Sequence, residues 1–151
     1  MKRLILPIIV LLLCSACTGE VGRIAPNFTV DDDVEIRYMQ NEYTAHVKTG
    51  KAGELTAVIK SPKTLKGITV TCSESRVTVG CGELKFEAGG GYIPFSTLYK
   101  TLKSAEASEP VSVRTDGEKT VYKYDGFTVE ADAETHKIEH IDTDKCVYEM
   151  R

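Results

Sequence analysis

Two closely spaced cysteines stand where the longest apolar stretch of the chain ends. Residues 4–13 are apolar throughout, and residues 14–17 then read Cys-Ser-Ala-Cys. A cysteine sulfur is a nucleophile, so a cysteine that becomes the first residue after cleavage can be acylated. The small side chains of Ser15 and Ala16 suit the narrow pocket of a signal peptidase. Cys17 is therefore the candidate site of lipid attachment.

The residues before Cys17 have the three parts of an export signal. Lys2 and Arg3 precede the apolar run, and small residues follow it. The run is about half as long as the roughly 20 residues that a membrane-spanning helix needs, so we expect residues 1–16 to be removed. The alternative is an ordinary secretory signal followed by a free cysteine.

The segment around Cys17 resembles a bacterial lipobox in which Cys14 stands where leucine is usual. The resemblance implies a diacylglycerol on Cys17 as the first mature residue. It also implies an exported protein held on the outer face of the cell membrane, or on the outer membrane of a cell that has two.

Other residues that could do chemistry are sparse. His136 and His140 point the same way on a predicted strand, but four strand residues span about 13 Å, too far for one metal. The acidic runs at 31–33 and 142–144 lack the spacing of a calcium loop, and we expect solvated turns there. Neither a nucleophile elbow nor a phosphate loop is present. We expect no enzyme, no metal and no cofactor.

Three cysteines remain after the lipobox, namely Cys72, Cys81 and Cys146. An odd number cannot be fully paired within one chain. In the predicted hairpin Cys72 faces Val77 and Cys81 faces Ile68, which puts these two thiols beyond disulfide reach. A bridge would need Cys146 or a different register. Otherwise all three stay reduced and buried as small hydrophobic residues.

The mature chain is mildly acidic. Removing residues 1–16 leaves 135 residues, with 17 lysines and arginines against 22 acidic residues and a net charge of −5. That length suits one domain with a modest core. Nucleic acid is a poor partner because binding it requires a basic face. An anionic lipid surface would not attract this chain either, so membrane attachment depends on the acyl anchor.

The rest of the chain divides into a tether and a β domain. Residues 17–27 are polar and contain glycine, and we expect a short tether there. From residue 28 onward apolar residues alternate with polar ones, as Val34 and Ile36 do, and turn sequences such as Asp125-Gly126 separate the runs. The pattern predicts an antiparallel meander of about ten short strands.

One segment, residues 93–108, has a helical period instead. Ser96 can cap a helix, and the glycines at 89–91 would give that helix a mobile entrance. The predicted apolar face is Phe95, Leu98, Leu102 and Ala105. A helix with one apolar face inside a meander must lie on the concave side of the sheet, or leave that face wet.

The order of these elements is similar to the LolA/LppX-like lipoprotein superfamily. The features that carry the resemblance are the lipobox, the stretches SPKTLKGITV and YIPFSTLYKTLKS, and the closing hairpin GFTVEADAETHKIEHID. The resemblance covers residues 28–151. It implies a mainly β fold with one helix, a half-open β-barrel with the helix on its concave face. It also implies a hydrophobic cavity for acyl chains, or a scaffold descended from one.

Two functions follow as hypotheses. The first is a non-catalytic binding module that holds a lipid or other hydrophobic ligand against the helix, with these candidate contacts: Phe95, Leu98, Tyr99 and Leu102. The second is an envelope scaffold with a filled core, whose strand edges or tyrosines meet a protein partner. These tyrosines are Tyr38, Tyr43, Tyr92, Tyr99, Tyr122, Tyr124 and Tyr148. A cavity beside the helix would favour the first hypothesis, and a void-free core the second.

Overall fold

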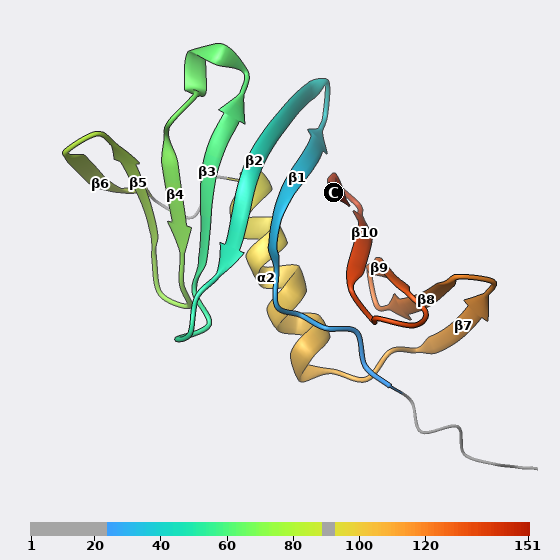
Figure 1. Cartoon of the computed structure of the whole chain (residues 1–151). Coiled ribbons are helices and arrows are strands. Elements are labelled where there is room, and N and C mark those ends of the chain that lie inside the picture. Colours follow the sequence, from blue (N-terminus) through green and yellow to red (C-terminus); the bar gives the residue numbers. More distant parts are fainter. Residues whose placement is uncertain (1–23, 89–92) are drawn as a thin grey trace, which may run out of the picture.

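A computed structural model of the chain describes residues 24–88 and 93–151, which form one curved antiparallel sheet and one long helix (Figure 1). The helix is α2 (Ile93–Ala107), and a short 3-10 helix, η2 (Lys63–Leu65), lies between two strands. The predicted signal peptide, the lipobox and the glycines at 89–91 lie outside the described residues. No helix within the described ranges is long and apolar enough to cross a membrane.

Every strand segment expected from the sequence is present, and the described strands number eleven. They are β1 (Asp31–Tyr38), β2 (Asn41–Thr49), β3 (Leu55–Ser61), β4 (Thr69–Cys72), β5 (Val77–Cys81), β6 (Leu84–Ala88), β7 (Ser112–Asp116), β8 (Lys119–Tyr124), β9 (Phe127–Asp132), β10 (Ile138–Thr143) and β11 (Cys146–Met150). Two-residue turns join several of them, and Gly117 and Gly126 take the positive φ that such turns require.

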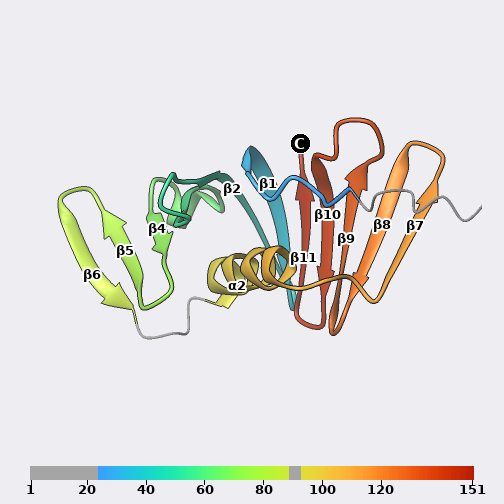
Figure 2. The same ribbon diagram turned by 90° about the horizontal axis from the view of Figure 1, so that it is seen from below.

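The sheet consists of two meanders joined at their first and last strands. Its order is β6-β5-β4-β3-β2-β1-β11-β10-β9-β8-β7, so β1 pairs with β11 in the middle and β6 and β7 form the two edges. Helix α2 connects these edges and lies within the curve of the sheet (Figure 2). The prediction of a half-open antiparallel barrel with the helix on its concave face is confirmed.

The core lies between α2 and the concave face of the sheet. Alternating strand residues point into it, as the sequence period predicts, and these are among those with under 2% exposure: Val34, Ile36, Val47, Leu55, Ile59, Val70, Val79, Val129, Ile141 and Tyr148. The Tyr148 hydroxyl donates a hydrogen bond of 2.7 Å to the carbonyl oxygen of Pro94. That bond ties the start of the helix to the middle of the sheet.

The predicted role of Ser96 is wrong. The helix begins at Ile93, so Ser96 lies inside its first turn and is only 5% exposed. A cap residue stands outside the helix with non-helical backbone angles, and the chain is already helical at this position. Pro94 has no backbone N–H and fits the first turn, where that donor would have no partner within the helix.

Candidate functional site

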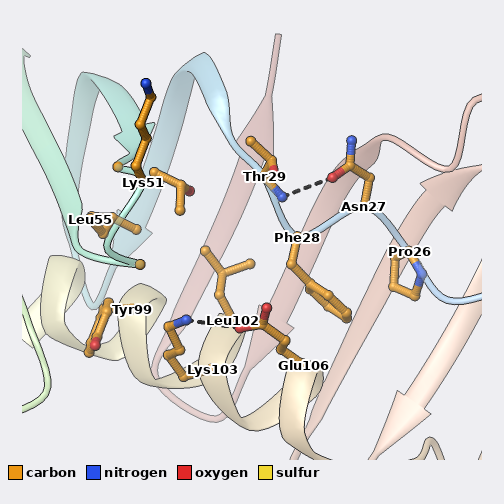
Figure 3. A pocket seen from close by; sticks show the side chains of 13 residues that line it. Pro26, Asn27, Phe28, Thr29, Lys51, Leu55, Tyr99, Leu102, Lys103 and Glu106 are labelled. Atoms are coloured by element: carbon orange, nitrogen blue, oxygen red, sulfur yellow. Dashed lines mark hydrogen bonds and ion pairs between the residues drawn. The ribbon is translucent and has the colours of Figure 1, made fainter.

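The four helix residues proposed as ligand contacts fall into two groups. Phe95 and Leu98 are 1% and 0% exposed, and they are enclosed between the helix and the sheet. Tyr99 and Leu102 lie further along α2 and line a pocket of about 360 Å³. The helix is therefore enclosed at Phe95 and Leu98, whereas Leu102 and Glu106 in its second half line this pocket (Figure 3).

Three elements form this pocket, which we call the head pocket. Its floor is the second half of α2, one wall is the β2–β3 loop (residues 50–54), and the other wall is the segment at 26–29 (Figure 3). Its lining residues are Pro26, Asn27, Phe28, Thr29, Thr49, Gly50, Lys51, Gly53, Leu55, Tyr99, Leu102, Lys103 and Glu106. The lining contains both polar and apolar residues.

Two lysines line the head pocket, Lys51 from the β2–β3 loop and Lys103 from α2, and the Lys51 ammonium points away from the helix (Figure 3). The Lys103 ammonium lies 2.9 Å from a carboxylate oxygen of Glu106, and this hydrogen bond raises the pKa of Lys103. Gly53 has a φ of +78°, and a Cβ there would lie 2.9 Å from the Lys103 Nζ. Glycine at this position therefore gives the loop its turn and leaves room for the ammonium.

A second pocket of about 180 Å³ adjoins the first, and we call it the tail pocket. Both pockets are lined by Pro26, Phe28 and Glu106, so they meet beneath the N-terminal segment. The remaining lining is mostly apolar, with Ser108 and Glu109 as its polar members. The other residues are Ile24, Ala25, Ala105, Pro110, Val113, Tyr122 and Tyr124. Burial raises the pKa of Tyr122 and of Tyr124, which keeps both phenols neutral.

The N-terminal segment, residues 24–30, roofs the junction of the two pockets. The Tyr122 hydroxyl donates to the carbonyl oxygen of Ile24 at 2.8 Å, and the Asn27 N–H donates to the carbonyl oxygen of His136 at 2.8 Å. Residues 24–27, which the sequence assigns to the tether, thus lie against the β domain. Val30, the last residue of the roof, is 3% exposed and hydrogen-bonded to Thr49, so the part that can open at lower cost than the sheet is residues 24–29.

Sequence reasoning missed Tyr122, Tyr124 and Val113 as pocket residues. A signal was present, since Tyr122 and Tyr124 share one face of β8 and Val113 on β7 lies opposite Tyr122. The alternation of residues on β8 could not indicate that this face borders a pocket, because the same alternation occurs when such a face is fully packed. Phe28 was also missed, since its place above the helix depends on where residues 24–30 cross the fold.

A cluster of charged groups lies on the outer face of β1 and β2. The His46 ring stands between two carboxylates, with Nε2 3.1 Å from Asp31 and Nδ1 3.0 Å from Asp33. Hydrogen bonds from Lys48 and Lys60 lower the pKa of Asp31 and of Asp33, respectively. The expectation that residues 31–33 form a turn is wrong, because they begin β1. The groups are half-exposed and charge-balanced, as on an ordinary polar sheet face.

The other two histidines do not share a strand face. His136 lies in the turn before β10 with a φ of 58°, and a bulge between Ile138 and His140 shifts the register of β10. The parity expected from the sequence is therefore wrong. In residues 24–88 and 93–151 no group of three or more His, Cys, Asp or Glu side chains could hold a metal ion.

The three cysteines beyond the lipobox are all free. Cys72 pairs with Val77 across the β4–β5 hairpin, as predicted. Cys72 and Cys146 are buried, and burial raises the pKa of the Cys72 thiol to about 11. Cys81 is exposed beside the β5–β6 turn, so the expectation that all three are buried is wrong for this residue.

Four of the tyrosines proposed to meet a partner are not on the surface. Those under 9% exposed are Tyr99, Tyr122, Tyr124 and Tyr148. Tyr38 and Tyr43 are partly buried against the core, and Tyr92 lies outside the described residues. Aromatic rings bury large apolar areas, so these buried tyrosines stabilise the fold and are not exposed to a partner.

Comparisons with known proteins found one similar fold and no similar sequence. No protein-family model matches the chain, and no curated protein matches it. One solved structure is similar, the LolA superfamily protein NE2245 from Nitrosomonas europaea, with 6% sequence identity and a TM-score of 0.38. The match covers 74% of this chain and 60% of that one. No residue of the two pockets is therefore assigned a role by similarity to another protein.

Proposed function

We propose that this protein is an exported lipoprotein, anchored through Cys17, that binds a single amphipathic lipid with an acidic head group and performs no catalysis. The acyl chain lies in the tail pocket against Val113, Tyr122 and Tyr124. The head group lies in the head pocket between Lys51 and Lys103. The ligand thus passes beneath the roof formed by residues 24–30.

The observation that carries the proposal is the pair of adjoining pockets at the second half of α2. Sites for small molecules usually measure about 300–1,000 Å³ and combine apolar walls with a few polar groups. The tail pocket, at about 180 Å³, is too small alone, but it continues into the head pocket of about 360 Å³. One end of the combined space is apolar and the other is polar, lined by Lys51, Lys103 and the Glu106 carboxylate that pairs with Lys103, a division that matches an amphipathic molecule.

The position of the proposed anchor fits this site. Ile24 begins the roof and stands seven positions after Cys17. Seven residues reach at most about 25 Å, so a lipid anchor on Cys17 would keep the pockets near the membrane surface. A ligand could then pass between bilayer and pocket over a short path.

The test is a titration of the purified full chain in detergent with a fluorescent fatty acid. Val113→Phe fills the tail pocket, so we expect its dissociation constant to rise about tenfold or more, on the scale of one lost apolar contact. Val111→Phe is the matched control, since Val111 is 73% exposed and lines neither pocket. Equal affinity of the two variants, or no saturable uptake by the wild type, would contradict the proposal.

The head pocket is tested by removing the charge of Lys103. We expect Lys103→Met to weaken binding of the fatty acid several-fold while leaving the uncharged fatty alcohol unchanged, because only the acid loses a partner. Lys123→Met removes a lysine that lines neither pocket and serves as control. Equal losses for acid and alcohol would assign Lys103 to packing and refute a charged head-group site.

The anchor is tested separately. Cys17→Ser should give unprocessed precursor or a protein released from membranes, because acylation needs the thiol. Membrane fractions washed with carbonate report the outcome. A cleaved Cys17→Ser protein that stays on the membranes would refute the anchor and leave the ligand site untouched.

The second hypothesis, an envelope scaffold without a ligand, is favoured by the first half of α2. Phe95 and Leu98 are almost completely buried, as in an ordinary packed core. Under this hypothesis the two pockets are surface hollows. Absence of lipid uptake, together with a large loss of stability in Leu102→Ala, would support it.

A further inference from the structure

Strand β6 is an edge strand with an uncovered apolar face. It pairs only with β5 among the described strands, so the far side of its backbone is open (Figure 1). Leu84 is 73% exposed and Phe86 54% exposed. Natural edge strands usually carry features that prevent pairing with another chain, and two exposed large apolar residues do the opposite.

The backbone groups that face the open side belong to Lys85 and Glu87. Cys81 and Leu84 are the pair that closes the two-residue turn between β5 and β6, and in such hairpins the closing pair is hydrogen-bonded. Pairs alternate along an antiparallel ladder, so Phe86 and Ala88 also bond to β5. The intervening residues, Lys85 and Glu87, therefore direct their N–H and C=O groups outward.

The strand sequence Leu-Lys-Phe-Glu-Ala is complementary to itself. In an antiparallel pair with a two-fold axis at Phe86, Lys85 of each chain lies opposite Glu87 of the other, and Leu84 lies opposite Ala88. The two Lys–Glu pairs are hydrogen-bonded pairs with opposite charges. The two Phe86 rings meet at the axis. We propose that β6 pairs with β6 of a second copy of this chain, which joins the two sheets edge to edge.

Charge excludes the neighbouring registers. An axis at Lys85 puts that lysine opposite its own copy, and Glu83 opposite Glu87. An axis at Glu87 puts two glutamates together. Like charges directly opposite one another destabilise a strand pair. Centring on Phe86 is thus the arrangement in which both the outward backbone groups and the charges match.

The other edge of the sheet lacks this property. On β7 an axis at the central residue, Arg114, puts two arginines opposite one another, and an axis at Thr115 pairs Arg114 with Asp116 but runs into the turn at Gly117. Val113, which precedes Arg114, lines the tail pocket instead of lying open. Matched charges over a whole strand and exposed large apolar side chains therefore occur together on β6 and not on β7. A partner of another sequence would need to supply the same alternation of charges.

The first test reverses the charges in the purified full chain, in detergent, with sedimentation to measure the dimer dissociation constant. Lys85→Glu and Glu87→Lys each turn both ion pairs into repulsions, so each should weaken the dimer about tenfold. The double variant K85E/E87K restores opposite charges and should return to within about threefold of wild type. Arg114→Glu, a charge reversal on β7, is the control and should change nothing.

The second test fixes the register. Residues in a central non-hydrogen-bonded pair have Cα atoms about 4.5 Å apart, within disulfide reach. In a Cys81→Ser background, F86C should therefore form a covalent dimer in air. L84C should not, because its two copies would lie about 14 Å apart.

Three results would overturn the proposal. They are a wild type that stays monomeric at about 100 μM, a double variant no tighter than the single ones, and crosslinking of L84C as fast as F86C. Stability of each variant, followed by urea unfolding, separates a lost interface from a lost fold. Neither test depends on lipid binding, so the proposed ligand site can fail while this interface stands.

Discussion

The two halves of helix α2 carry similar apolar residues but have different surroundings. Phe95 and Leu98 in the first half lie against the middle of the sheet, where the Tyr148 hydroxyl bonds to Pro94. Leu102 and Ala105 in the second half border the head and tail pockets, covered by a loop and the N-terminal segment. Helical spacing puts a residue on the apolar face, and the element opposite decides whether it is enclosed.

The largest difference should appear when one leucine in each half is shortened. Leu98→Ala leaves a cavity in a closed core and should lower the free energy of unfolding by about 2–5 kcal/mol. Leu102→Ala enlarges a pocket that is already open, so its loss should lie near or below the low end of that range. Urea unfolding without lipid measures both. Equal losses would mean that the second half is as well packed as the first.

Bound lipid should stabilise the fold only while the tail pocket is open. At a fatty acid concentration of 100 times the dissociation constant, the wild type should gain about 2.7 kcal/mol. Leu98→Ala should gain the same amount, since Leu98 lines neither pocket. Val113→Phe should gain little. Thermal unfolding with and without the fatty acid tests this, and an equal gain in Val113→Phe would place the ligand elsewhere.

Two buried hydroxyls tie the helix end and the roof to the sheet. Tyr148→Phe removes the bond to Pro94 from a fully buried site, and we expect a loss of about 1–3 kcal/mol. Tyr122→Phe removes the bond to Ile24 and should cost about 1 kcal/mol or less, because the roof can bond to water instead. Hydrogen exchange at residues 24–30 should rise in Tyr122→Phe and not in Tyr148→Phe. Faster exchange in Tyr148→Phe but not in Tyr122→Phe would show that the Tyr122 hydroxyl does not hold residues 24–30 in place.

An effect that is absent at neutral pH is expected at alkaline pH. Burial raises the pKa of the Cys72 thiol from 9.0 to about 11, so the native state keeps a proton that the unfolded state releases. The stability that this gives is complete below pH 9 and falls as the pH rises towards 11. Urea midpoints between pH 8 and 11 should fall less steeply in Cys72→Ala. Equal slopes of the urea midpoint against pH in the wild type and in Cys72→Ala would show that solvent reaches the Cys72 thiol in the native state.

Strand positions could be read from the sequence because alternation and turns are local properties. Val34, Ile36 and their neighbours alternate with polar residues, and Asp125-Gly126 forms a tight turn whatever surrounds it. The apolar spacing of α2 was also readable, and all four residues of its predicted face are buried. The first residue of α2 could not be predicted, since Ser96 is a residue type typical of helix caps but lies three positions inside the helix.

The candidate site was only half accessible to sequence reasoning. Tyr99 and Leu102 were predicted contacts and line the head pocket, whereas Phe95 and Leu98 were predicted equally and do not. Nothing local distinguishes these pairs. Phe28, Val113 and Tyr122 come from three segments that are far apart in the chain, so only the fold could bring them together.

By itself the sequence determined the alternation of the strands, the turns between them, the single amphipathic helix and the self-complementary charges of β6. These depend on neighbours within a few residues. The tertiary structure decided that β1 pairs with β11, that β6 and β7 are the edges of the described sheet, and that Tyr99 and Leu102 line a pocket while Phe95 and Leu98 do not. Those outcomes depend on which distant segments meet, and burial of apolar surface is non-directional, so no local pattern fixes them.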